Sequence, residues 1–463
     1  MQEPSAGVVI VGAGITGLAL ALELERQGVS VRILEAADRV GGAIQTVRED
    51  GFLYERGPNS LLLRRPEVGQ WLESHGLTDR MAAASGAVSK RFLVKSGRIR
   101  PMPRSPLSAI TTPLYSPTAK LGVTLEPFRA PTDSEDESVA SFVSRRLGRE
   151  FLDYGIAALV NGVYAGDAER LSMRHAFPRV WNLERLGGSL IKGALKLKQQ
   201  RKAAGEAPYK SRIVSWRGGL EELTGQMAAK LQQPPTLRAS LEDIRRDGPG
   251  WRIAFAAVGG QRQEIRTRHV VVTTPVHRWA QLPWAAEIAP TVAQVPVPRY
   301  APVATMLLGF RREQVRHPLD GFGVLIPPKE GQRLLGAIFS STLFAGRAPE
   351  GQVALSCFLG GMRHQEVVDL SQTERLRIAL DTLKPLLGIT GEPTKVMETC
   401  WPQAIPQYEL GYENLLASVQ ALEAAQPGLH FLGNFREGPG LYDCLDSARR
   451  HAVELAKDAG EHV

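Results

Sequence analysis

Three glycines and a carboxylate near the start of the chain have the residue types and spacing of a nucleotide-binding site. The glycines are Gly12, Gly14 and Gly17, and Glu35 follows them at close to the ~20-residue spacing of a ribose-binding acid. Gly12 permits a tight turn, Gly14 lets backbone approach a pyrophosphate, and Gly17 lets helix and sheet pack closely. Free N–H groups at the start of a following helix would bind the phosphates, and the carboxylate would accept hydrogen bonds from ribose hydroxyls.

The elements needed to position these residues are present in the sequence around them. Residues 8–11 are a continuous apolar run that is typical of a strand buried on both faces. Residues 18–24 carry a helical pattern that ends at Gly28, and residues 29–34 resemble a second strand. A lone glycine motif would be weak evidence, whereas a complete strand, turn, helix and strand predicts a Rossmann-type βαβ unit.

The segment after Glu35 favours FAD over NAD, a choice that the glycine motif alone does not make. It runs through Arg39 to Gly41 and Gly42, and it resembles the R-x-G-G segment of the group that contains amine oxidases, desaturases and protoporphyrinogen oxidases. The resemblance implies non-covalently bound FAD, with the paired glycines close to the flavin and the arginine close to its phosphates. Cys400 is not in the setting of the cysteines that bind flavin covalently in monoamine oxidases.

Further segments narrow the resemblance and extend it over nearly the whole chain, which resembles the protoporphyrinogen IX oxidase family. The matching segments are ERGPNS from Glu55, KRFLV from Lys90, GVYAGD from Gly162, GFGVL from Gly321, WPQAIPQY from Trp401 and GPGLYDC from Gly438. The resemblance implies an FAD-dependent oxidase of haem biosynthesis that removes six electrons from protoporphyrinogen IX by repeated hydride transfer to flavin N5. Dioxygen would reoxidise the flavin and give hydrogen peroxide.

The substrate implies a particular pocket, and the resemblance assigns residues to it. A porphyrinogen is a large apolar macrocycle with two propionates on one edge, so we expect an aliphatic and aromatic pocket with one cationic anchor. Arg91 would pair with a propionate, although taken alone it would be read as half of a surface salt bridge. Leu325, Ile338 and Phe358 would sandwich the ring, and Asn59 and Gly162 would contact it beside the flavin.

No catalytic side chain and no metal are expected, because the flavin supplies the redox chemistry. The resemblance and the glycine motif together assign the cofactor to a larger set of positions. These are Gly12, Ala13, Gly14, Ile15, Thr16, Gly17, Glu35, Ala36, Arg39, Gly42, Ala43, Gly57, Pro58, Asn59, Ser60, Leu241, Trp401, Pro439, Gly440 and Leu441.

The predicted fold class is α/β, with three domains. A discontinuous Rossmann-type FAD-binding domain would take residues 1–84, 209–290 and 400–463, because flavin-type segments occur at the start, middle and end. Residues 291–399 would form a mixed α+β substrate-binding domain, and residues 85–208 a helical, membrane-associated domain. Residues 105–119 are uncharged and broken by prolines, so we expect an irregular stretch that docks on a membrane interface, a surface loop being the alternative.

Composition limits the partners and the location. Across 463 residues, Lys and Arg exceed Asp and Glu to give a net charge of +8, which favours a carboxylate substrate or an acidic membrane surface. No nucleic-acid-reading motif is present, and the three cysteines lack metal-site spacing. We expect a bacterial protein, peripheral on the cytoplasmic side of the membrane, with the cytoplasm as the alternative. A homodimer and hand-off of product to a ferrochelatase are further expectations.

Three other functions are compatible with parts of the sequence. A coproporphyrinogen III oxidase of the same fold is the nearest, but that Gram-positive subgroup lacks the arginine that matches Arg91 and differs over residues 335–341. An amine oxidase or carotenoid desaturase would leave the segments from Gly162 and Trp401 unexplained. A flavin-free scaffold would be colourless when purified.

Overall fold

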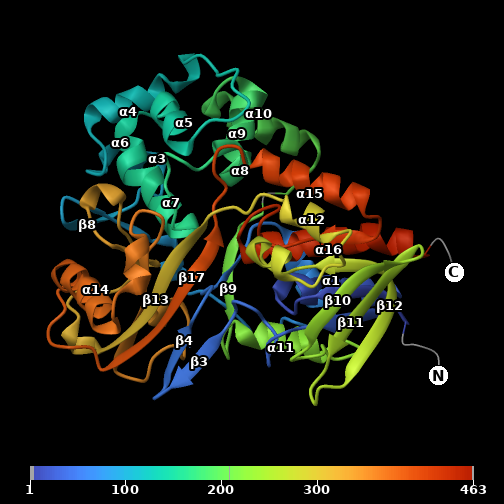
Figure 1. Ribbon diagram of the computed structural model, residues 1–463. Helices are drawn as coiled ribbons and strands as arrows, with labels where there is room; N and C mark the ends of the chain where they lie inside the picture. Colours follow the sequence, from blue (N-terminus) through green and yellow to red (C-terminus); the bar gives the residue numbers. More distant parts are fainter. Residues whose placement is uncertain (1–4, 208, 461–463) are drawn as a thin grey trace.

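The computed structural model describes residues 5–207 and 209–460, which form two large sheets and a lobe of helices (Figure 1). The first sheet has six strands in the order β10-β11-β12-β1-β2, with β18 also paired to β12. Its strands are β1 (Ser5–Val11), β2 (Val31–Leu34), β10 (Ser240–Asp247), β11 (Gly250–Ala256), β12 (Arg262–Val272) and β18 (Leu429–Phe431). β1 runs parallel to β2 and β12, while β10, β11 and β12 form an antiparallel meander.

The predicted βαβ unit is confirmed: it consists of β1, the helix that follows it and β2. Val8, Val9 and Ile10 are fully buried, as expected for a strand covered on both faces. Helix α1 (Ile15–Arg26) connects β1 to β2 and packs with α11 (Glu221–Ala229) and α16 (Leu441–Gly460) in one apolar core. Helix α15 (Glu413–Ala425) contributes to a second core on the other side of the sheet.

Shorter strands lie between the two large sheets. β3 (Thr46–Glu49) and β4 (Phe52–Glu55) form a hairpin, and β5 (Leu61–Leu63), β9 (Arg212–Trp216) and β6 (Met81–Ala83) form a three-stranded sheet. Helix α2 (Pro66–Ser74) follows β5. The hairpin reaches the second large sheet, where the Tyr54 hydroxyl donates to the carbonyl oxygen of Thr305 over 2.9 Å.

The second large sheet has seven strands in the order β17-β13-β16-β15-β14-β7-β8. They are β7 (Phe92–Lys95), β8 (Arg98–Pro101), β13 (Tyr300–Arg311), β14 (Gly323–Leu325), β15 (Leu334–Ile338), β16 (Gln352–Gly360) and β17 (Lys395–Pro406). Helix α14 (Gln372–Leu387) covers one face with an apolar core, and the short helix α13 (Ser340–Leu343) follows β15. A capping box between Ser371 and Glu374 begins α14, and Gly388 in a left-handed conformation ends it.

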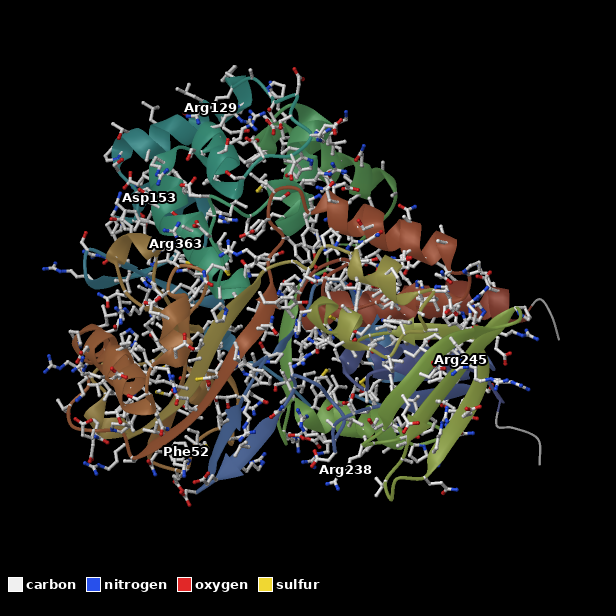
Figure 2. The ribbon with its side chains drawn as sticks, viewed as in Figure 1. Phe52, Arg129, Asp153, Arg238, Arg245 and Arg363 are labelled. Atoms are coloured by element: carbon white, nitrogen blue, oxygen red, sulfur yellow. The ribbon has the colours of Figure 1, made fainter. Side chains whose placement is uncertain are left out.

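The helical lobe lies at the top of the molecule in Figure 1, where Arg129 is labelled in Figure 2. Its helices are α3 (Pro106–Thr111), α4 (Pro117–Thr124), α5 (Val139–Arg146), α6 (Arg149–Phe151), α7 (Ala157–Tyr164), α8 (Met173–Ala176), α9 (Pro178–Gly187) and α10 (Leu190–Ala203). Arg146, fully buried, pairs with Glu126 and Glu184 and ties three segments of the lobe together. Over the described residues, no helix combines the length and the apolar character needed to cross a bilayer.

Two features differ from the sequence-based expectations. Residues 105–119 are not irregular throughout, because they contain α3 and the start of α4. Pro106 and Pro117 each lie in the first turn, where the missing N–H has no helical partner to lose, and Ser105 and Ser116 cap the helices. The expected domain limits also cut across the second sheet, since β7 and β8 pair into it and β17 continues past residue 400.

Candidate functional site

The glycine turn forms a cradle that is tightly packed at Gly12 and Gly17 and open at Gly14. Gly12 has a φ of +109°, and a Cβ on Gly17 would lie only 2.2 Å from the Gly12 carbonyl oxygen. By contrast, a Cβ on Gly14 would meet nothing within 4 Å. Gly14 is the N-cap of α1 and provides no side-chain cap. The first N–H groups of α1 are therefore placed to bind an anionic group such as a pyrophosphate.

Glu35 lies beside this turn at the end of β2. Its Oε2 accepts from the Ala13 N–H over 2.7 Å, and its Oε1 accepts from the Ala37 N–H over 2.8 Å. Each carboxylate oxygen has a second acceptor site, which leaves capacity for ribose hydroxyls. The Ala239 N–H donates to the Glu35 carbonyl oxygen over 2.9 Å. Strand β10, which carries Leu241, therefore begins close to Glu35.

A second loop closes against the glycine turn. Gly14 and Gly41 form an isolated bridge, and a Cβ on Gly42 would lie 3.4 Å from the Gly14 Cα. A Cβ on Gly57 would lie 2.2 Å from the Ala43 carbonyl oxygen, so the two backbones are in contact there. The Arg39 guanidinium donates to carbonyl oxygens of its own loop, at Val40, Gly42 and Ile44. Arg39 thus shapes the loop, and its predicted phosphate contact would use its remaining N–H groups.

The C-terminal helix begins near the same region. Helix α16 starts at Leu441, directly after Pro439 and Gly440, as the sequence predicted. Arg64, which follows β5, forms an ion pair with Asp443 in the first turn of α16. Burial raises the pKa of Asp443. The ion pair holds the start of α16 in place. The open space at Gly14 and the close approach of the Gly41–Gly42 loop fit a dinucleotide such as FAD.

The predicted ring-contacting residues lie on one face of the seven-stranded sheet. Gly336 on β15 pairs with Leu325 on β14 and with Phe358 on β16, so these two side chains point to the same side. Ile338 follows Gly336 by two residues and shares that side. We call the face that carries Leu325, Ile338 and Phe358 the substrate face. The opposite face is covered by α14.

The register extends the substrate face in both directions. Trp401 pairs with Val303, which also pairs with Gly360 two residues beyond Phe358, so Trp401 is on this face too. Its indole N–H donates to the Arg56 carbonyl oxygen over 2.8 Å, directly before the predicted flavin residues Gly57 to Ser60. At the other end, Leu93 pairs with Leu325, and Arg91 precedes Leu93 by two residues.

Arg91 is exposed and has no carboxylate partner in the part of the chain that the structure describes. Its guanidinium lies 5.5 Å from the centre of the Phe322 ring, and no ion pair is recorded for it among residues 5–207 and 209–460. The surface salt bridge that the sequence left open is therefore not formed there. Gly162 on α7 lies over the same face, because a Cβ on it would come within 2.8 Å of Leu325 Cδ2.

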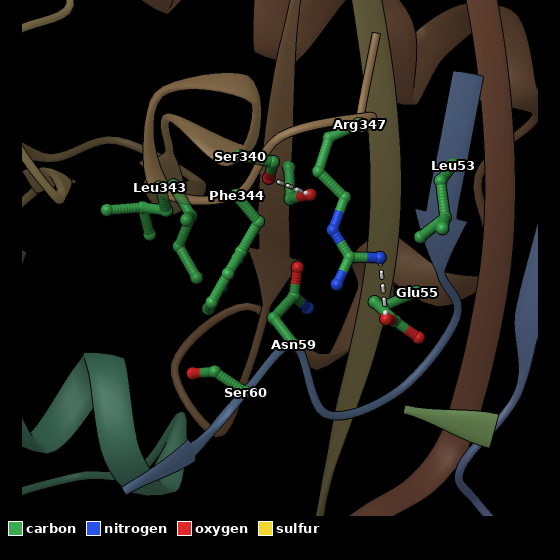
Figure 3. A pocket seen from close by; sticks show the side chains of 10 residues that line it. Leu53, Glu55, Asn59, Ser60, Ser340, Leu343, Phe344 and Arg347 are labelled. Carbon is green, nitrogen blue, oxygen red and sulfur yellow. Dashed lines mark hydrogen bonds and ion pairs between the residues drawn. The ribbon is translucent and has the colours of Figure 1, made fainter. Parts of the chain in front are cut away.

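A small cavity lies between residues of the substrate face and the segment that follows β4, and Figure 3 shows its side chains. Asn59, Ser60 and Ile338 line it together with a buried ion pair between Glu55 and Arg347. Sequence analysis missed this pair as a functional feature. Glu55 begins one of the matching segments, but no signal in the sequence connects it to an arginine 292 residues away.

The structure also bears on the cysteines and on metals. The three cysteines are free, with Cys357 and Cys444 buried and Cys400 half-buried. Cys400 pairs with Ala304 and packs into the core under α14, on the side away from the substrate face. In the described part of the chain, no group of three His, Cys, Asp or Glu side chains could hold a metal ion.

Comparison with known proteins places this arrangement among flavoproteins. The model of the flavin containing amine oxidoreductase family matches residues 15–456. Protoporphyrinogen oxidase 2 of Arabidopsis thaliana is 32% identical over 93% of this chain and 90% of that protein. Coproporphyrinogen III oxidase of Bacillus subtilis is 28% identical over 97% of both chains. A crystal structure from Exiguobacterium sp. 255-15, assigned to protoporphyrinogen oxidase, has a TM-score of 0.79 and 25% identity, covering 98% of this chain and 100% of that one.

Proposed function

Since this chain belongs to the flavin containing amine oxidoreductase family and uses FAD, we propose that it oxidises protoporphyrinogen IX to protoporphyrin IX. The observation that carries the proposal is the substrate face. It presents apolar side chains from three neighbouring strands. Directly before the next strand lies the exposed Arg91, which has no ion-pair partner among the described residues, and at the other end lies a tryptophan beside the flavin segment. This is the combination that a flat apolar macrocycle with propionates on one edge requires.

The residues of the face bind and orient the substrate. Leu325, Ile338 and Phe358 pack against the macrocycle, and their half-buried side chains exclude water from the reacting carbon. Arg91 pairs with a propionate through two parallel N–H donors and so fixes the rotation of the ring in its plane. FAD, when bound, supplies the redox chemistry by accepting hydride, and dioxygen is the final acceptor. Three such two-electron oxidations complete the conversion.

The cradle residues would hold the cofactor. The α1 N–H groups would bind the pyrophosphate, Glu35 the ribose, and the segments at Gly42 to Ala43, Gly57 to Ser60 and Pro439 to Leu441 the flavin end. Non-covalent attachment is supported by the position of Cys400, which packs under α14 and away from this side of the sheet.

Coproporphyrinogen III is the alternative substrate, because the relatives from Bacillus subtilis and Staphylococcus aureus, 28% and 29% identical, are coproporphyrinogen III oxidases. Arg91 at the edge of the face, without an ion-pair partner among the described residues, favours protoporphyrinogen, which has fewer carboxylates than coproporphyrinogen. The test is turnover of both porphyrinogens by the FAD-loaded protein in air, followed by porphyrin fluorescence. Faster turnover of coproporphyrinogen would reverse the assignment, and no turnover of either would overturn it.

We further propose that the helical lobe docks on a membrane surface. Five large apolar side chains of α3, α4 and the turn after α4 are more than half exposed. They are Leu107, Ile110, Leu121, Leu125 and Phe128. The neighbouring helix α10 adds exposed Leu195 and a row of lysines, and the ammonium of Lys192 lies 5.9 Å from the centre of the Phe128 ring. Apolar side chains beside basic ones suit an anionic lipid surface. Hand-off to a ferrochelatase and a homodimer stay predictions from the resemblance.

A further inference from the structure

A buried ion pair lies beside the substrate face, in the small cavity that Ile338 also lines. Arg347 and Glu55 are 3% and 4% exposed, and Arg347 Nη1 donates to Glu55 Oε1 over 3.0 Å. In Figure 3 the Arg347 guanidinium points into the cavity toward Asn59 and Glu55. The cavity is also lined by Asn59 and Ile338, so the pair shares it with a predicted flavin-contacting residue and a predicted substrate-contacting one.

The pair connects segments that are far apart in the sequence. The second guanidinium nitrogen of Arg347 donates to Ser215 Oγ on β9 over 2.6 Å. The Glu55 carboxylate also accepts from Thr46 Oγ1 over 2.6 Å and from the Leu220 N–H over 2.9 Å. A planar guanidinium with two occupied donor directions fixes orientation as well as distance, which an ammonium group does not. The segment that carries Arg347 is thus anchored to both the β3–β4 hairpin and β9.

The same segment is held at its other end by the substrate face. Residues 339–347 follow Ile338 directly, and the Ser340 hydroxyl lies 2.7 Å from the Ser356 hydroxyl on β16. Near the end, the Leu53 N–H donates to the Arg347 carbonyl over 3.2 Å, and the guanidinium lies 5.3 Å from the centre of the Phe344 ring. Residues 339–347 are therefore held at both ends, by β16 next to Ile338 and by the β3–β4 hairpin that precedes Asn59.

We propose that Arg347, through Glu55 and Ser215, is a positioning residue that sets the separation between Ile338 on the substrate face and Asn59 beside the flavin. The inference rests on the proposed function for its substrate. A change in this separation alters how well the macrocycle fits, while the cradle around Gly12 to Gly17 and Glu35 is untouched. Loss of the pair should therefore weaken substrate binding without releasing FAD.

The test uses three variants of the full-length, FAD-loaded protein. R347K keeps the buried charge but loses the two directed hydrogen bonds of the guanidinium. E55Q/R347M removes both charges, so that neither is left buried alone. This double variant keeps the test valid if R347M by itself does not fold. R311K is the matched control, because Arg311, the last residue of β13, forms an exposed ion pair with Glu313. The measurements are flavin content, KM and kcat for protoporphyrinogen, and hydrogen exchange of residues 339–347.

For R347K and E55Q/R347M we expect one flavin per chain, a KM raised about tenfold, a kcat within about twofold, and exchange of residues 339–347 about tenfold faster. R311K should match the wild type. Unchanged exchange, or faster exchange with an unchanged KM, would overturn the inference by reducing the pair to a stabilising contact. If the wild type itself turned over no porphyrinogen, the proposed function would fail. The exchange data would still show whether the Glu55–Arg347 pair anchors residues 339–347.

Discussion

Gly162 on α7 lies against Leu325 of the substrate face, and this leaves no room for a side chain at position 162, since a Cβ would lie 2.8 Å from Leu325 Cδ2. Helix α7 therefore sets how closely the helical lobe approaches the substrate face. Because the obstructing atom is the end of a flexible side chain, a small substituent can be accommodated if Leu325 moves into the pocket.

Gly162→Ala should narrow the pocket and raise KM by roughly five- to twentyfold, an effect of about 1–2 kcal/mol, with FAD content unchanged. Adding Leu325→Ala should restore part of the loss, because it removes the obstructing methyl groups. Gly225→Ala, where a Cβ meets nothing within 4 Å, is the control and should leave KM unchanged. Equal KM for Gly162→Ala and the wild type would remove α7 from the pocket.

Arg91→Ala should raise KM more than it lowers kcat, because the anchor binds the ground state and the transition state alike. A charge-assisted pair contributes about 1.5–3 kcal/mol, so a KM increase of roughly 10- to 100-fold is expected. Arg98→Ala tests general charge loss, since Arg98 is exposed on the adjacent strand β8. A KM that did not change in Arg91→Ala would place the propionate elsewhere.

The parts of the fold that sequence analysis predicted correctly are those with local signals. The βαβ unit follows from the spacing of Gly12, Gly14 and Gly17, and the start of α16 follows from Gly438 and Gly440, all within a few residues of the element they define. The helices α3 and α4 were missed because prolines were read as breakers. At Pro106 and Pro117 they instead occupy first turns, where proline is well tolerated.

Sequence analysis could select candidate site residues, but not the surface that they form. Leu325, Ile338 and Phe358 were selected by matching segments, yet only strand register shows that they share a face and that Arg91 directly precedes the adjoining strand. The Glu55–Arg347 pair depends on a contact between residues 292 apart, which a single sequence does not reveal. Long-range pairing, rather than residue type, is the missing information.

Glu35→Ala should weaken FAD binding by roughly 10- to 100-fold, because it removes a charged acceptor from the ribose and leaves the Ala13 and Ala37 N–H groups without their partner. Flavin retained after gel filtration and a titration of the apoprotein with FAD would measure the loss. Asp38→Ala, an exposed acid of the same loop, should retain FAD. Full retention by Glu35→Ala would exclude the carboxylate from the ribose site.

Acid should destabilise the protein through a stack of three histidines between the six-stranded sheet and α16. His269 Nδ1 and His430 Nε2 are 3.2 Å apart, and the rings of His430 and His451 are 5.3 Å apart. Arg268, Arg436, Glu423, Arg450, Glu454 and Asp458 are the charged groups around them. Burial, reinforced by the neighbouring histidines and Arg436, lowers the pKa of His430 to about 3.

Because folding lowers the pKa of His430, its neutral imidazole favours the folded state. This contribution to stability is complete above the unfolded pKa of about 6.5 and is lost as pH falls toward 3. At pH 5 the loss from His430 is about 2 kcal/mol. His430→Gln should therefore flatten the decline of Tm between pH 6.5 and 4, whereas His364→Gln, away from the stack, should not. Parallel profiles for His430→Gln and the wild type would show that the stack does not titrate with unfolding.

Replacing apolar side chains at the tip of the helical lobe should release the protein from lipid. Phe128 is 84% exposed and Leu107 is 71% exposed, and burying side chains of this size in an interface contributes about 1.5–3 kcal/mol each. Leu107→Ser/Phe128→Ser should therefore lower the partition onto phosphatidylglycerol vesicles by at least about tenfold, measured by flotation, with kcat on detergent-dispersed substrate unchanged. Val258→Ser is the matched control, because Val258 is 71% exposed in the turn between β11 and β12, on the other sheet. Equal partition of the double variant and the wild type, or equal loss in the control, would assign the exposed apolar surface to another partner.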